Sequence, residues 1–508
     1  MMGEEESLPR DGPFYEQPQF WQGLFLVAII LNVYVILNSD LGLDAHVEGA
    51  YVQTEDGWVL DWGDTRTEDP LASNPQDAKV VHEESVNNNS LKVFASLGMI
   101  LTLLIALKLG LNRSTMTILM LNPALIFSVG RGYSEYIYLG LLTIAWVVWN
   151  QNRQNDEQKF LPRLTAITIA SVLMLSIWSS KLKVDPMEML IPLMILMVVG
   201  CLIDRIPNEW LNPQKALIGG FFFGICAIIF AGIMGYGSFS IVTSEPIRFI
   251  QSLPISVFGV IFVYGFVGMV LWPFAKQTWK RMGNSTDRMT GELSLFIGTM
   301  SGLIVAYVAC LWTFESVLWD SEWPWHMWTM GNNGRYITIL AIPCYLLIQR
   351  VNEDLDWRKP MAIGGILLIL PLSVAAGIHG QTYWTDDAAD VLSENMNENE
   401  DFLFVHDAML GMHYLYTFHT HIEEVSERNI TGHWRAPTSN WETELFGEVM
   451  IQDRGDLSSV KWVVLAPGVE WSTPPEGWHS TTGMADFMNG GGEWQVWASS
   501  DQFTTSET

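Results

Sequence analysis

Basic residues and cysteines are scarce in this chain. Its 508 residues include 27 Lys and Arg against 55 Asp and Glu, which gives a net charge of −28. A chain this acidic repels the phosphate backbone of nucleic acids, so we expect no nucleic-acid partner. All four cysteines lie in apolar runs, which predicts neither a disulfide framework nor a cysteine metal site; they are Cys201, Cys226, Cys310 and Cys344.

Nucleotide-binding motifs are also missing. The sequence has no GxGxxG after an expected strand and no GxxxxGK[ST] loop. No segment expected in the cytoplasm is large enough to hold a nucleotide. We therefore predict no cofactor and no metal, and we expect any donor substrate to come from the membrane. Runs such as 215–234 and 291–312 carry almost no charge, which argues against an ion-driven transporter.

Long apolar runs, in contrast, are abundant, and the mean hydropathy of the chain is +0.20. A helix needs about 20 apolar residues to cross a bilayer. The runs predict an α-helical polytopic membrane protein with about 11 transmembrane helices, at 20–37, 91–109, 114–129, 133–149, 162–179, 186–203, 215–234, 254–272, 291–312, 336–349 and 361–378. Runs 114–129 and 336–349 are short, so we expect them to be tilted, re-entrant or buried against neighbours.

The basic residues predict the orientation. With the N-terminus inside, 15 Lys and Arg fall in inside loops and 8 in outside segments before the tail, as the positive-inside rule requires. This predicts a cytoplasmic segment 1–19, a membrane domain 20–378 with a long outer loop 38–90, and an extracytoplasmic acidic domain 379–508. We thus predict a multi-pass membrane protein with its C-terminal domain outside.

The tail differs in character from the rest of the chain. DFLFVHD (401–407), VKWVVLAP (460–467) and WQVWAS (494–499) are typical of strands, and 408–418 of a helix. A small extracytoplasmic α/β C-terminal domain is therefore expected. Its histidines lack metal-type spacing, so we interpret them as surface or packing residues. In the outer loop, TEDGWVLDWGDT (54–65) predicts a short hairpin.

Acidic residues follow the first apolar run. In NSDLGLDAHVEGAY (38–51), Asp44, His46 and Glu48 are spaced so that two of them share one face of a short helix or turn. A carboxylate at the water–lipid boundary is suited to act as a general base toward a hydroxyl group. The alternative is a solvated acidic loop. His82 and Glu83 return to the membrane face at the end of the same outer loop.

Charged residues in the other outer connections are further candidates. Glu135 opens an apolar run and is either functional or a partner of Arg131 one helical turn away. Lys181 and Arg248 follow two later runs. Arg335 either snorkels to the interface or holds a phosphate with its planar guanidinium. The tryptophan-rich stretch 315–335 is an interfacial belt or a stacking surface for a sugar or an isoprenoid.

Three stretches together resemble the GT-C superfamily of membrane glycosyltransferases. NSDLGLDAH (38–46) is similar to its acidic motif after the first helix, and NPALIFSVGRGYSE (122–135) to a segment of GPI-type mannosyltransferases. GRYITILAIP (334–343) resembles a motif that opens a late helix in several branches. The likeness covers roughly 20–378. The chain lacks the Trp-Trp-Asp-Tyr-Gly motif of oligosaccharyltransferases, which argues against transfer to asparagine and against an obligatory metal.

The resemblance implies transfer of a mannose-like sugar, with inversion, from a polyprenyl- or dolichyl-phosphate donor. The acceptor would be a hydroxyl group of a glycan, lipid or protein at the outer face, with membrane lipid around the protein. It places the general base at Asp44, oriented by His46 or Glu48, and assigns donor or acceptor binding to Glu135, Arg248, Arg335, Tyr336 and Lys181, with His82 and Glu83 as further candidates. The alternatives are a lipid-linked saccharide flippase or transporter and, for the tail, a receptor-like binding module.

Overall fold

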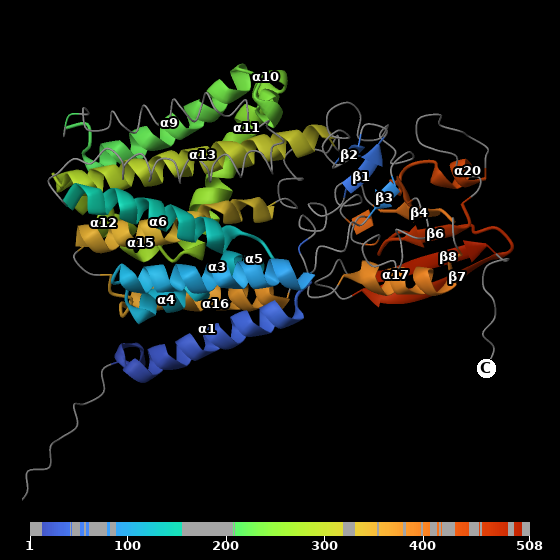
Figure 1. Ribbon diagram of the computed structural model, residues 1–508, viewed down its shortest axis with the longest axis horizontal. Coiled ribbons are helices and arrows are strands. Elements are labelled where there is room, and N and C mark those ends of the chain that lie inside the picture. The colour runs from blue at the N-terminus through green and yellow to red at the C-terminus, as the bar shows by residue number, and fades with distance from the viewer. Residues whose placement is uncertain are drawn as a thin grey trace, which may run out of the picture.

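The computed structural model consists of a bundle of long helices and a smaller unit built on a β-sheet, which lies at one end of the bundle (Figure 1). The structure describes residues 13–40, 42, 51–54, 57–59, 79–81, 88–154, 207, 209–318, 331–352, 355–378, 383–397, 400–406, 414–415, 418, 432–446, 457, 460–485 and 492–499.

Among the described residues, five helical segments are long and apolar enough to cross a membrane. They are α1 (Pro18–Asn38), α9 (Pro213–Ile233), the continuous pair α11 (Pro246–Ser256) and η6 (Val257–Gly268), α13 (Arg288–Leu318, apolar to Thr313), and α16 (Pro360–Ile378). Many of their large apolar side chains are exposed, as expected of surfaces that face lipid. These segments indicate a membrane protein. Predicted runs 162–179 and 186–203 lie outside the described residues.

The other predicted runs correspond to α3 (Asn88–Lys108), α6 (Glu135–Gln154) and two interrupted segments. Run 114–129 is split into α4 (Arg113–Met120) and α5 (Pro123–Gly130). The break has a local cause. The Asn122 side chain accepts hydrogen bonds from the Ala124 and Leu125 N–H groups, and Pro123 is the first residue of α5. Run 336–349 is likewise divided, into the 3₁₀-helix η7 (Gly331–Leu340) and α15 (Ala341–Asn352).

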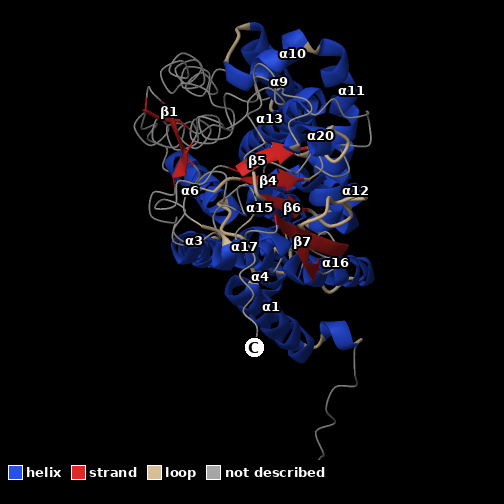
Figure 2. Cartoon of the chain, turned by 90° about the vertical axis from the view of Figure 1, so that its right-hand side faces the viewer, coloured by secondary structure: helices blue, strands red, loops and turns tan. Residues whose placement is uncertain are grey.

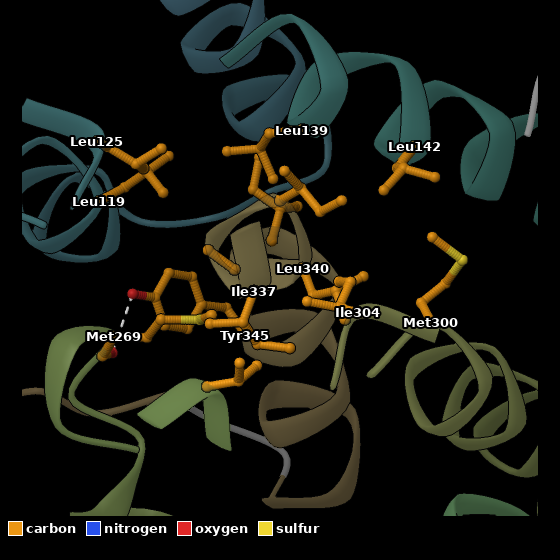
Figure 3. Close-up of a cluster of buried hydrophobic side chains, with 14 of the residues drawn as sticks. Leu119, Leu125, Leu139, Leu142, Met269, Met300, Ile304, Ile337, Leu340 and Tyr345 are labelled. Carbon is orange, nitrogen blue, oxygen red and sulfur yellow. Dashed lines mark hydrogen bonds between the residues drawn. The ribbon is translucent and has the colours of Figure 1, made fainter. Parts of the chain in front are cut away.

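Helices α9 and α13 pack along most of their length because glycines bring their backbones together. A Cβ atom at Gly302 would lie 2.0 Å from the Phe221 carbonyl oxygen, and one at Gly224 would lie 2.3 Å from the Thr299 carbonyl oxygen. Such small residues permit close helix approach inside a bilayer. The core continues toward α15, where Tyr345 donates its hydroxyl hydrogen to the Met269 carbonyl oxygen at 3.0 Å among leucine and isoleucine side chains (Figure 3).

Shorter helical elements lie before and between these helices. They are η1 (Phe14–Glu16), η5 (Gly237–Ser240), α10 (Ile241–Ser244) and α12 (Trp272–Asn284). Segment 38–90 contributes β1 (Tyr51–Thr54), β2 (Gly57–Val59) and β3 (Lys79–Val81), in the order β2-β1-β3. The antiparallel pairing of Thr54 with Gly57 confirms a hairpin in the predicted stretch, and Trp58 lies on its second strand.

The C-terminal unit is an α/β structure. Its sheet has the order β5-β4-β6-β8-β7, formed by β4 (Phe402–Val405), β5 (Gly432–Arg435), β6 (Trp462–Leu465), β7 (Trp478–Ala485) and β8 (Gly492–Ser499). Strands β5, β4 and β6 are parallel, and β8 and β7 add antiparallel partners. This confirms the three predicted strands. Of the predicted helix at 408–418, the described residues 414, 415 and 418 are helical.

Alternate residues of the central strand β4 point to opposite faces of the sheet and belong to two separate hydrophobic cores. Phe402 and Phe404 pack with α17 (Trp384–Asn395) on one face, and Leu403 and Val405 pack with α20 (Trp441–Leu445) on the other. Figure 2 shows these strands in front of the helical bundle, in a view from the side of the C-terminal unit. Helix α17 follows α16 of the bundle in the chain and packs on the sheet of the α/β unit.

Candidate functional site

Charged side chains gather where the helical bundle meets the C-terminal unit. We call this group the junction cluster, and it comprises Asp40, Lys92, Arg131, Glu135, Arg335, Tyr383 and Asp386. These residues come from the ends of α1 and α3, the turn between α5 and α6, η7, and the start of α17. The ends of α1, α3 and α5 lie beside α17 in Figure 1. Segments up to about 350 residues apart in the sequence therefore contribute to one site.

A buried ion pair forms the inner part of the cluster. Arg335 Nε donates to Glu135 Oε1 at 2.8 Å, and the two side chains are only 2% and 4% exposed. The guanidinium also lies 4.5 Å from the centre of the Tyr133 ring and 4.9 Å from that of Tyr336. The second carboxylate oxygen of Glu135 is buried and has no hydrogen-bond partner within the part of the chain that the structure describes. Buried charges of this kind persist only when other charges or a ligand compensate them.

Arg131 lies next to this pair. Its Nη1 donates to the carbonyl oxygens of Phe127 (3.3 Å) and Ala376 (3.2 Å), and its guanidinium stacks 4.0 Å from the centre of the Phe127 ring. Its Nη2 is buried and has no hydrogen-bond partner among the described residues. Because the residue is 2% exposed, water does not readily satisfy this donor. Within the described part of the chain, the Nη2 amino group of Arg131 is therefore an unused donor.

The part of the cluster nearest the C-terminal unit combines acids with a lysine. Lys92 donates to the Ser39 carbonyl oxygen at the end of α1, beside Asp40. The Asp40 carboxyl group is hydrogen-bonded to that of Asp386, and burial raises the pKa of Asp40. Burial, together with the charge of Asp40, raises the pKa of Asp386 to about 8. One carboxyl group of the pair therefore carries a proton at neutral pH.

Glu135 has a different partner from the one considered from the sequence. We weighed a pairing with Arg131, four residues earlier, but Arg131 caps the end of α5 and Glu135 begins α6. The two residues do not share a helix, so the spacing of one helical turn does not bring them together. Arg335, 200 residues later, pairs with Glu135 instead.

Arg248 is not part of the junction cluster in any contact of the described residues. Its Nη1 donates to the Ser316 carbonyl oxygen at 3.0 Å, and its side chain, 34% exposed, lies 3.9 Å from Glu245. Tyr336 borders the cluster, because its ring lies against the guanidinium of Arg335. The other predicted residues, Asp44, His46, Glu48, His82, Glu83 and Lys181, and most of the tryptophan-rich stretch, lie outside the described residues.

Sequence reasoning assigned no site role to Lys92, Arg131, Tyr383 or Asp386. Arg131 stands in the quoted GRGY stretch and was counted among the outer basic residues, so a signal for it existed. Nothing local distinguishes Asp386 from the other acids of the tail, because its importance comes from contact with a residue more than 300 positions away.

The sequence matches no known family model, and comparison with curated proteins and with solved structures found no similar protein.

Proposed function

We propose that this chain is an integral-membrane glycosyltransferase. In this proposal it moves a sugar, mannose-like, from a polyprenyl-phosphate donor to a hydroxyl group at the outer face of the membrane. The observation that carries the proposal is the buried junction cluster, which holds two arginines and a lysine at the end of a helical bundle. Asp40, the first acid of the stretch 38–46 that resembles the GT-C motif, belongs to this cluster.

The charge of the cluster is suited to an anionic lipid headgroup. Ionisable groups at the end of an apolar bundle cost free energy, so their retention favours a functional role. Arg335 is engaged by Glu135, whereas Arg131 keeps an unused Nη2 donor. We therefore assign phosphate binding first to Arg131 and then to Arg335, whose planar guanidinium groups match phosphate geometry. Glu135 has a carboxylate oxygen available for a sugar hydroxyl.

The chemistry requires a base and a stabilised leaving group. Asp44, four residues after Asp40, accepts the proton of the acceptor hydroxyl as its oxygen bonds to the anomeric carbon. The bond from that carbon to the phosphate oxygen breaks on the opposite side, which inverts the configuration. Polyprenyl phosphate leaves with the bonding electrons, and the cations stabilise its developing charge.

The Asp44→Asn variant tests the reaction. We expect transfer from polyprenyl-phosphate mannose in isolated membranes to fall by about 10²–10⁴, and Arg131→Gln to weaken donor binding. Glu245→Gln, on the partly exposed ion pair outside the cluster, is the matched control and should transfer at the wild-type rate. Near-normal transfer by Asp44→Asn would contradict the assignment. Movement of the labelled lipid across vesicles with no new glycosidic bond would favour a flippase.

We further propose an eleven-span topology with the N-terminus in the cytoplasm and the C-terminal unit outside. It requires the turn at Ser240 and the turn at Ser285 to lie on opposite sides, because the continuous segment α11–η6 separates them. In a cysteine-free background on sealed cells, an impermeant thiol reagent should label Ser240→Cys and spare Ser285→Cys. Labelling of Ser285→Cys would overturn this orientation and separate the acidic stretch from the outer face.

A further inference from the structure

A hydrogen bond between two carboxyl groups joins the helical bundle to the C-terminal unit. Asp40 lies two residues after the end of α1, and Asp386 lies in the first turn of α17. Their side chains are hydrogen-bonded to each other although 346 residues separate them. The Asp40 carboxyl group also accepts a hydrogen bond from the backbone N–H of Tyr383, the residue that precedes α17. The end of α1 is therefore fastened directly to the start of α17.

The pair is enclosed on several sides. Among the described residues, Asp40 faces Lys92 from α3, Arg131 from the α5–α6 turn, and Tyr383 and Asp386 from the start of α17. Asp386 faces Asp40 and Tyr383 and lies beside the exposed Asp387. Oδ2 of Asp40 is buried, and no described residue forms a hydrogen bond with it. The positive charges of Lys92 and Arg131 favour a negative charge on Asp40, but a second negative charge on Asp386 would face that of Asp40 directly.

A carboxylate cannot donate a hydrogen bond to another carboxylate, because both offer only acceptors. The bond between Asp40 and Asp386 therefore requires a proton on one of them. Burial, followed by the charge of Asp40, raises the pKa of Asp386 to about 8. The first turn of α17 opposes this, since its unpaired N–H groups favour an ionised carboxylate. Removal of the proton converts a hydrogen bond into a repulsion at the same place.

We propose that Asp40 and Asp386 form a pH-sensitive latch, which holds the C-terminal unit against the end of α1 while the pair shares one proton and loosens when both groups are ionised. The latch depends only on the contact between the two parts of the chain. It is therefore independent of the proposed transfer reaction, and either proposal can fail without the other.

The direction of the effect follows from proton linkage. The docked form binds the extra proton up to about pH 8, whereas a freely exposed aspartate releases it near 3.8. Docking therefore takes up a proton in this window, so it is strongest at low pH and weakens as the pH rises through the docked pKa. One proton corresponds to about a tenfold change in the docking equilibrium per pH unit. Above the docked pKa the dependence disappears.

Hydrogen–deuterium exchange of the full-length protein in detergent micelles measures the latch directly. Peptides that cover the start of α17 report on docking, and peptides from the middle of α13 serve as an internal reference for the intrinsic effect of pH on exchange. We expect the corrected opening of α17 in the wild type to rise about tenfold per unit from pH 6 to 8 and then level off. In Asp386→Asn the amide donates to Asp40 without a proton, so the opening should not depend on pH.

Asp387→Asn is the matched control, because it removes one charge from the same helical turn at an exposed position. It should keep the wild-type slope. If Asp386→Asn does not fold, Asp40→Asn tests the same proton from the other side and should also abolish the slope. A wild type without a slope would overturn the latch. Equal slopes in the wild type and in Asp386→Asn, or a slope abolished by Asp387→Asn, would overturn it as well.

Discussion

Replacement of Arg335 by methionine tests whether the buried ion pair holds the bundle together. Methionine keeps much of the length and apolar volume of arginine but removes the charge that faces Glu135 at 2.8 Å. The loss of one partner of a buried pair typically costs about 3–5 kcal/mol, because the remaining charge is left uncompensated. At about 1.4 kcal/mol per tenfold change, the unfolding equilibrium shifts by roughly two to three and a half orders of magnitude.

The double variant Arg335→Met/Glu135→Leu separates lost attraction from the penalty of an unpaired charge. With both charges replaced by apolar groups, most of the lost stability should return, since paired removal is often nearly neutral. Arg248→Met is the control. That guanidinium is 34% exposed and its carboxylate partner is 3.9 Å away, so we expect a change of no more than about 1 kcal/mol.

Unfolding in mixed detergent–SDS micelles, followed by tryptophan fluorescence, gives the free energies for the cycle. The reasoning predicts a marked non-additivity between the two single variants. It is refuted if Arg335→Met is as mild as Arg248→Met. It is also refuted if the double variant is destabilised by the full sum of the two single changes.

Three other substitutions probe the fold by the same unfolding measurement. Gly302→Ala should destabilise the fold by about 1–3 kcal/mol, because the added Cβ would lie 2.0 Å from a backbone oxygen of α9. A Cβ at Gly219 would meet nothing within 4 Å, so Gly219→Ala should be neutral. Equal effects of the two variants would contradict the packing argument. Asn122→Ala should cost about 0.5–2 kcal/mol through the lost cap of α5, and Asn122→Ser should recover part of it if the cap is the cause. Burial alone would raise the pKa of Asp287, but the hydrogen bonds from Arg350 and Thr290, together with the charge of Arg350, outweigh it and lower the pKa below 3.8. The ionised Asp287 therefore stabilises the fold above pH 3.8, and this stabilisation is lost as the pH falls through the lowered pKa. The wild type should lose less than about 1 kcal/mol of unfolding free energy in this way on acidification, and Asp287→Asn should not show this loss.

The long apolar helices could be predicted from the sequence because composition over about 20 residues largely determines them. Helices α1, α9, α13 and α16 fall where their runs predicted them. Strands β4, β6 and β8 of the C-terminal unit were equally visible as short apolar runs, whereas β5 and β7 are not apolar and were not predicted. Run 114–129 was predicted as one span, although the Asn122–Pro123 pair carries both a helix cap and a favourable first residue. The Asn122–Pro123 pair therefore signals a helix start, but the prediction followed the continuous apolar run instead.

The candidate site was harder to predict, because long-range contacts define it. Glu135 and Arg335 were both singled out, but only the folded chain pairs them. Arg248 has the same composition-based signal as Arg335 and lies instead at a partly exposed pair with Glu245. A sequence marks which charges lie near the end of an apolar run. It does not mark which of those ends converge.

Arg131 connects the two proposals made here and also separates them. It contacts the Ala376 carbonyl oxygen near the end of α16, and its charge acts on Tyr383 at the start of α17. A change at Arg131 would therefore disturb both an anion site and the docking of the C-terminal unit. Asp386 contacts Asp40 and Tyr383, whereas Arg335 pairs with Glu135. Asp386→Asn removes the titrating proton but leaves every cation of the cluster in place. If docking then no longer depends on pH while donor binding persists, docking and donor binding belong to different residues of one cluster.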